Sequence, residues 1–311
     1  MKLATCLLAT TATLAALAVA PAIAADPASC GKIRMSDPGW TDITSTNAIS
    51  TTLLEALGYD TDIKTLSVPV SFEALKTGDI DVFLGNWMPA QTAARETMAA
   101  NKSGEVLAKN LGDAKMTLAV PTYVEVDDFK DLAANADKFD SRIYGIEAGA
   151  AANQNIQKAI DADEYGLGKW TLVETGEQAM LAQVARAEKK QDWIVFLGWA
   201  PHPMNINIPM KYLSGGDDVF GPNYGGAEVY TLSRPGFAAD CPNAAQLFKQ
   251  LTFSLDMENQ MMNEILGGEA ADTAAAGWIK ANPAALDGWL AGVTTLSGEP
   301  GLPAVKAELG L

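Results

Sequence analysis

The chain has 311 residues, of which 19% are charged, and a formal net charge of −16. Such an acidic chain is a poor partner for the phosphate backbone of nucleic acids, and we therefore expect no binding to nucleic acid. Its length fits one large domain or two ordinary ones.

The first 24 residues have the pattern of a secretory signal peptide. Lys2 is followed by an apolar run from Leu7 to Ala20, and Ala22-Ile23-Ala24 forms a small-residue cleavage signal. We predict cleavage near Ala24 and export to the periplasm. Cys6 lies before the apolar run and no cysteine marks the cleavage point, so a lipid anchor is not expected.

Two cysteines remain after the predicted cleavage, Cys30 and Cys241. In an exported protein such a pair is most simply a disulfide, and two buried free thiols are the alternative that the sequence leaves open. A bridge would join the start of the mature chain to a point about 210 residues later. Both ends of the chain would then belong to one body.

Strand and helix patterns alternate along the chain, which favours an α/β fold with mostly parallel sheets flanked by helices. Strands are expected at residues 32–35, 62–68, 81–88, 116–120, 143–146, 171–173, 193–199 and 227–232. Helices are expected at residues 47–57, 71–76, from about 150, 178–189 and 244–266. For the last of these helices the sequence predicts one continuous run capped by Asn243.

Motifs for catalysis or cofactors are missing from the sequence. Its one histidine, His202, lies between two prolines and is expected to be structural. Nucleophile-elbow, phosphate-loop and dinucleotide motifs do not occur. The acids Asp127, Asp128 and Asp131 lack calcium-loop spacing and are better read as a solvated helix start. We therefore expect neither an enzyme nor a protein with a metal or cofactor.

Three tryptophans stand where predicted strands end. Trp87 ends the run Asp81-Val82-Phe83-Leu84-Gly85-Asn86-Trp87-Met88-Pro89, Trp199 ends a similar run before Pro201, and Trp40 follows the first strand. Ligands of open α/β sheets bind at the carboxyl ends of the strands. Core packing is the alternative for each ring and the expected role of Trp170, Trp193, Trp278 and Trp289. Three rings at three strand ends favour a ligand box.

These motifs resemble one family over essentially the whole mature chain. The segments are Ser36-Asp37-Pro38-Gly39-Trp40-Thr41-Asp42, Gly85-Asn86-Trp87-Met88-Pro89, Gly198-Trp199-Ala200-Pro201-His202-Pro203-Met204-Asn205 and the helix after Cys241-Pro242-Asn243. They are similar to the periplasmic choline-binding proteins of bacterial ABC importers, within the broader glycine betaine and choline substrate-binding group. The resemblance implies a two-lobed, type II-like clamshell that works with a membrane permease and an ATPase.

The resemblance also implies lobe boundaries and a ligand site. Lobe 1 would consist of residues 25–117 and 230–311, with lobe 2, residues 118–229, inserted between them. Trp40 and Trp87 from lobe 1 and Trp199 from lobe 2 would surround a methylated cation. Asp42 and Asn153 would bind the hydroxyl end of choline. A monomer is expected.

Met116 departs from this pattern, because the choline proteins would have a tyrosine there. Methionine is polarizable but has no π face. Choline is therefore the first choice, and dimethylsulfoniopropionate, glycine betaine, carnitine or trimethylamine oxide remain alternatives. A ligand-sensing partner of a signalling receptor is the alternative from another class.

Overall fold

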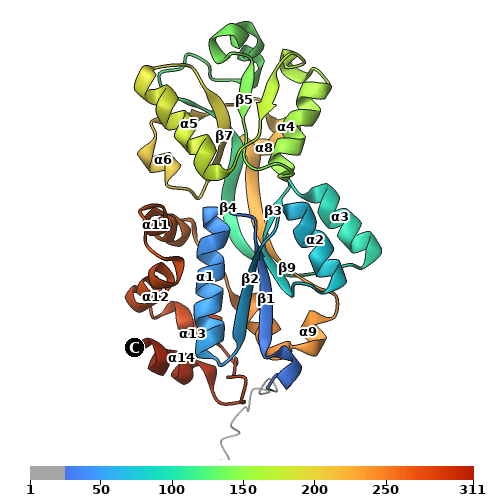
Figure 1. The fold of residues 1–311 in the computed structure, drawn as a ribbon, viewed down its shortest axis with the longest axis vertical. Coiled ribbons are helices and arrows are strands. Elements are labelled where there is room, and N and C mark those ends of the chain that lie inside the picture. The colour runs from blue at the N-terminus through green and yellow to red at the C-terminus, as the bar shows by residue number, and fades with distance from the viewer. Residues whose placement is uncertain (1–24) are drawn as a thin grey trace, which may run out of the picture.

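The protein has two lobes, stacked along its long axis and joined by two long strands (Figure 1). The structure is a computed structural model that describes residues 25–311, so the predicted signal peptide and Cys6 lie outside the described residues. Within residues 25–311, none of the helices has both the length and the apolar character needed to cross a bilayer. The two-lobed α/β fold predicted from the sequence is confirmed.

Lobe 1, the lower lobe of Figure 1, combines the early and late parts of the described chain. Its strands are β1 (Lys32–Asp37), β2 (Asp60–Thr65) and β3 (Val82–Met88). Its early helices are η1 (Ala28–Cys30), α1 (Thr41–Ala56), α2 (Val68–Thr77) and α3 (Thr92–Asn101). Its late helices are α9 (Phe237–Asp240), α10 (Pro242–Gln250), α11 (Leu255–Leu266), α12 (Ala271–Ala281), α13 (Ala285–Trp289) and α14 (Gly301–Leu309).

Lobe 2, the upper lobe, is built from the middle of the chain. Its strands are β5 (Arg142–Tyr144), β6 (Thr171–Val173), β7 (Val195–Ala200) and β8 (Met210–Tyr212). Its helices are α4 (Ala151–Asp161), α5 (Glu177–Lys190), α6 (Met204–Asn207), α7 (Asp217–Phe220) and α8 (Pro222–Gly225), with the short η2 (Phe129–Asp131), η3 (Ala133–Phe139) and η4 (Glu164–Gly166).

Strands β4 (Glu105–Pro121) and β9 (Gly226–Ser233) connect the lobes. The strand order is β2-β1-β3-β9-β4-β7-β5-β6, with β8 also paired to β4. Strand β4 changes its pairing partner at Lys115, which pairs with Gly226 of β9 on one side and with Ala200 of β7 on the other. The predicted boundary at residues 117/118 lies close to this point, and the lobe boundaries themselves stay a prediction.

Each lobe has a parallel set of three strands, as predicted, and the connecting strands add antiparallel pairings. Strands β1, β2 and β3 pair in parallel, as do β5, β6 and β7. Every pairing made by the connecting strands β4 and β9 is antiparallel. The sequence pattern predicted only residues 116–120 of β4, because its first half carries polar residues without a regular alternation.

The predicted continuous helix over residues 244–266 is wrong. The chain breaks between α10 and α11, and Ser254 caps α11 by accepting a hydrogen bond from Met257 N at 3.2 Å. Asn243 is not the cap of α10 either. The carboxylate of Asp26 accepts from Asn243 N at 2.7 Å and Ala244 N at 2.9 Å, so a distant residue caps that helix.

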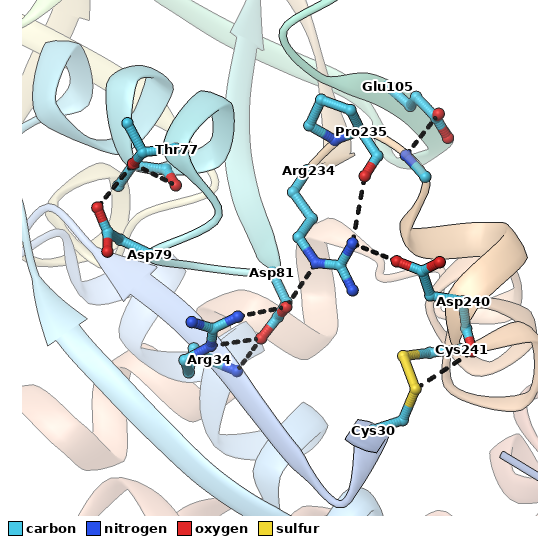
Figure 2. Close-up of polar contacts among 12 residues, drawn as sticks. Cys30, Arg34, Thr77, Asp79, Asp81, Glu105, Arg234, Pro235, Asp240 and Cys241 are labelled. Carbon is cyan, nitrogen blue, oxygen red and sulfur yellow. Dashed lines mark hydrogen bonds and ion pairs between the residues drawn. A yellow bond between two sulfur atoms is a disulfide. The ribbon is translucent and has the colours of Figure 1, made fainter. Parts of the chain in front are cut away.

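The predicted disulfide is confirmed. Cys30 and Cys241 are bridged, with their Cα atoms 5.7 Å apart across a sequence separation of 211 residues. Figure 2 shows the bridge beside a polar cluster in which Asp81 is held by Arg34 and Arg234. The bridge and the cluster both join the beginning of lobe 1 to the segment that returns from lobe 2.

Candidate functional site

A small cavity lies between the lobes, where the ends of several strands meet. It is lined by Trp40, Asp42, Trp87, Ala90, Gln91, Met116, Ile146, Ala150, Ala151, Ala152 and Trp199. The structure therefore brings together five of the six predicted ligand residues. Its wall is aromatic and aliphatic, and among the described residues that line it there is no lysine, arginine or histidine.

The first wall comes from the turn after β1. Asp37 at the end of β1 accepts hydrogen bonds from Gly39 N and Thr44 Oγ1, both at 2.7 Å. Gly39 has a φ of +89°, a conformation that suits glycine. This turn makes Trp40 the residue before helix α1 and places Asp42 in the first turn of the helix, facing the cavity.

The second wall is Trp87 near the end of β3. Its indole Nε1 donates to Asp42 Oδ2 at 3.0 Å, so the ring and the carboxylate fix one another. The turn after it is held by Gln91, which accepts from Asn86 Nδ2 at 3.0 Å and donates to Gly85 O at 2.8 Å. Gln91 and the neighbouring Ala90 also line the cavity.

The third wall comes from lobe 2. Trp199 on β7 lies opposite Met116 on β4 in an antiparallel pair, so the two side chains are neighbours on one face. Asn205 Nδ2 donates to Trp199 O at 2.8 Å and holds the chain after the strand. The His202 ring packs edge-on against the Trp199 ring, with centroids 5.0 Å apart.

Asp42 is the most unusual group in the cavity. Its side chain is buried, and among the described residues Oδ1 has no hydrogen-bond partner. Burial, reinforced by the nearby charge of Glu177, raises the pKa of Asp42 to about 8. A buried carboxylate oxygen without a partner is unfavourable, so this atom is suited to receive a hydrogen bond or a cation from a ligand.

Asn153 does not line the cavity. Its amide oxygen accepts from Ile146 N at 3.1 Å, and its amide nitrogen donates to Ile146 O, Glu147 O and Glu174 Oε1, each at 3.0 Å. The side chain thus holds the loop after β5. That loop supplies Ile146 to the cavity wall and Glu147 as the hydrogen-bond partner of Trp40.

Two lobe 2 glutamates near the cavity were not predicted from the sequence. Glu147 Oε2 accepts from Trp40 Nε1 at 2.8 Å, and burial raises the pKa of Glu147 to about 7. Glu177 Oε2 accepts from Thr41 N at 3.0 Å. Glu147 follows strand β5, so the rule of strand ends that singled out the tryptophans would also have found it. Glu177 opens helix α5 and carries no comparable signal.

The remaining sequence interpretations concern residues outside the cavity. Trp170 and Trp289 are buried in the core, and Trp278 stacks on Trp289 with centroids 5.8 Å apart. Trp193 packs against Phe139. Asp128 caps η2 by accepting from Lys130 N at 3.1 Å, as expected for a helix-start acid.

The family follows from a match over most of the chain. Residues 31–281 match the substrate-binding domain of ABC-type glycine betaine transport systems. The chain belongs to this family. Members are substrate-binding proteins of transport systems, and the predicted relationship to the glycine betaine and choline group is confirmed.

Solved structures and a curated relative agree with this family. An ABC-transporter choline binding protein in complex with choline is 54% identical, with a TM-score of 0.90, and the match covers 92% of this chain and 100% of that one. An unliganded semi-closed form, also 54% identical, has a TM-score of 0.84 over 91% and 100% of the chains. The glycine betaine/carnitine transport binding protein GbuC of Listeria monocytogenes is 31% identical over 57% of either chain.

Proposed function

We propose that the chain is an exported, monomeric substrate-binding protein that captures choline and delivers it to the permease and ATPase of an ABC importer. The observation that carries the proposal is a buried carboxylate, one oxygen of which has no partner among the described residues, in a cavity walled by three tryptophans. The 54% identity to a choline binding protein over nearly the whole chain supports the same ligand.

The three indole rings suit a quaternary ammonium. Such a cation has no N–H to donate at its methylated centre, so ring faces and burial of its methyl groups supply the attraction. Cation–π contacts contribute about 2 kcal/mol each when desolvated. Each buried methyl adds about 0.8 kcal/mol. Since a micromolar Kd corresponds to about 8 kcal/mol, Trp40, Trp87 and Trp199 supply enough attraction in scale.

Asp42 suits the other end of choline. A hydroxyl group donates one hydrogen bond, and Asp42 Oδ1 is a buried acceptor beside the rings that receives none from the described part of the chain. A carboxylated ligand would instead bring its charge toward Asp42, with no cationic side chain among the described lining residues to receive it. Met116 completes the wall beside Trp199, and Asn153 acts through the loop it holds.

A zwitterionic onium compound such as glycine betaine or dimethylsulfoniopropionate is the second candidate. The observation that favours it is that Ala150, Ala151 and Ala152, at the start of helix α4, line the cavity. Free backbone N–H groups at a helix start attract carboxylates. The family description, which names glycine betaine, is consistent with it.

A calorimetric titration against choline, glycine betaine, dimethylsulfoniopropionate, carnitine and trimethylamine oxide tests the proposal. We expect choline to bind most tightly and to be recovered chemically unchanged, because the protein is a carrier and not an enzyme. Tighter binding of a carboxylated compound would replace choline with the second candidate. Binding of no compound in the panel would overturn the proposed function.

A further inference from the structure

A second set of contacts between the lobes lies just outside the cavity, at the first residues of helix α1. Trp40 supplies a cavity wall and Thr41 follows it. Helix α1 has no cap from a side chain of its own first residues. The partner of its first backbone N–H is instead Glu177 of lobe 2, at 3.0 Å from Thr41 N. A carboxylate at this position satisfies a free N–H and interacts favourably with the helix dipole.

Several polar contacts hold the Glu177 side chain in this position. It is buried, and its second oxygen accepts hydrogen bonds from Thr41 Oγ1 and, at 3.0 Å, from Gln178 Nε2. His202 Nε2 lies 3.4 Å from the same oxygen. Because His202 Nδ1 accepts from Met204 N at 2.9 Å, the proton of a neutral ring is on Nε2 and faces Glu177.

These contacts connect the cavity walls of the two lobes. On the lobe 1 side, Thr41 stands between Trp40 and Asp42. On the lobe 2 side, His202 packs against the Trp199 ring. A movement that separates Glu177 from Thr41 would therefore also separate the lobe 1 and lobe 2 rings that line the cavity.

We propose that Glu177 is the positioning residue of an interlobe latch, in which its carboxylate caps helix α1 of the opposite lobe and so holds the ligand cavity shut. The proposal rests on the proposed function, because the latch acts on the same cavity. Glu177 does not line the cavity, so it governs how long a ligand stays rather than which ligand is chosen. The higher TM-score to the choline complex than to the unliganded semi-closed form agrees with a closed arrangement here.

The test is a double-mutant cycle with choline as the probe, using Glu177→Ala, Thr41→Val and the double variant. Each single change should weaken choline binding about tenfold or more, mainly through faster release, as expected for loss of a charge-assisted hydrogen bond. The double variant should be little worse than Glu177→Ala, because Thr41→Val removes only the hydroxyl contact, which Glu177→Ala has already removed together with the contact to Thr41 N. Independent, multiplying effects of the two changes would overturn the latch.

Three controls separate a latch from a general structural role. Glu177→Gln keeps an oxygen for Thr41 N and should recover part of the affinity. Glu164→Gln, the same charge change at an exposed position of lobe 2, should leave affinity unchanged. The secondary structure of ligand-free Glu177→Ala, measured by circular dichroism, should equal that of the wild type, because the contact joins two lobes that each keep their own fold. A clear loss of secondary structure would make Glu177 a fold residue and overturn the proposal.

Small-angle scattering separates failure of the latch from failure of the proposed function. With saturating choline the wild type should contract, whereas Glu177→Ala should remain more extended. Equal choline affinity and equal contraction in both proteins would overturn the latch. If the wild type does not bind choline, the proposed function fails and the latch is judged on the ligand-free proteins. There it predicts a larger radius of gyration for Glu177→Ala, and equal radii would overturn it.

Discussion

Two aspartates of lobe 1, Asp42 and Asp81, are equally buried, each with 3% of its surface exposed, yet their surroundings are opposite. Asp81 meets two arginines, as Figure 2 shows. Its oxygens accept from Arg34 N, Nε and Nη2 and from Arg234 Nε, all at 2.9 Å. Asp42 accepts one hydrogen bond from the Trp87 side chain, and its Oδ1 has no partner among the described residues.

The pKa values of the two groups follow from these partners. Burial alone would raise the pKa of Asp81, but the hydrogen bonds and charges of Arg34 and Arg234 lower it. For Asp42, burial and the charge of Glu177 act in the same direction and raise the pKa to about 8. A buried carboxylate that is paired with cationic side chains of the protein stabilises the fold. A buried carboxylate without such partners is suited to bind a cationic ligand.

The largest effect on stability is expected at Asp81. Asp81→Asn leaves two arginines without their carboxylate, so the free energy of unfolding should fall by about 3 kcal/mol, the low end for a broken buried pair because both arginines are partly exposed. Choline affinity should change less than about threefold. Urea denaturation and calorimetry at pH 7 measure the two quantities. A stable variant with lost binding would reverse the roles assigned to the two aspartates.

The acid limb of stability should also depend on Asp81. Its pKa is lowered by folding, so its contribution is present above the pKa of an unfolded aspartate, about 4, and is lost as the pH falls through the folded value. Wild-type stability should therefore decline more steeply below pH 4 than that of Asp81→Asn. Parallel curves for the two proteins, measured by urea denaturation between pH 2 and pH 5, would contradict this account.

For Asp42→Asn we expect the opposite result, namely weaker choline binding without a loss of stability. Choline binding at pH 8 should weaken by about 1.5 to 3 kcal/mol, the range for a hydrogen bond to a charged group. Between about pH 4 and pH 8 the ligand-free wild type holds a proton that the unfolded chain has lost, so its stability falls with rising pH, by up to about 1.4 kcal/mol per unit. The ligand-free variant should escape this loss and be the more stable protein at pH 8. Lower stability together with unchanged affinity would show that Asp42 serves the fold.

A smaller effect is expected at Met116, the wall residue opposite Trp199. Met116→Tyr adds a ring face and should tighten binding of trimethylammonium ligands by about 0.5 to 2 kcal/mol. A sulfonium, with two methyl groups and a pyramidal centre, should gain less. Titrations of choline and dimethylsulfoniopropionate against each variant compare ligands within one protein and cancel any change in stability. Equal shifts would mean that Met116 does not choose between them.

Much of the fold was predictable because it rests on local patterns. The apolar runs before Gly85 and Gly198 specified β3 and β7, and the two cysteines after the predicted cleavage point specified their pairing. The break between α10 and α11 was not predictable from periodicity, because apolar residues continue through it. The cap of α10 was also hidden, since Asp26 lies far away in the sequence and reaches the helix only in the folded protein.

The cavity was predictable in its rings but not in its supports. Trp40, Trp87 and Trp199 stand beside glycine or proline at strand ends, a signal visible in the sequence. Glu147 and Glu177 lie more than 100 residues from their partners and act across the lobes. The strand-end rule could have found Glu147, whereas Glu177 carries no such signal and only the structure reveals it. The structure also gives Asn153 a supporting place behind the cavity wall, which its position in the motif did not distinguish from contact with a ligand.

The most direct test of the contrast between Asp42 and Asp81 is the number of protons released when choline binds at pH 7. Calorimetry in buffers of different ionisation enthalpy measures this number. A cation that enters beside Asp42 should lower its pKa from about 8 and expel its proton. We predict release of about one proton by the wild type and by Asp81→Asn, and much less by Asp42→Asn. Choline binding with no proton release by the wild type would contradict the account, because Asp42 would then not be a protonated group that loses its proton when a cation binds.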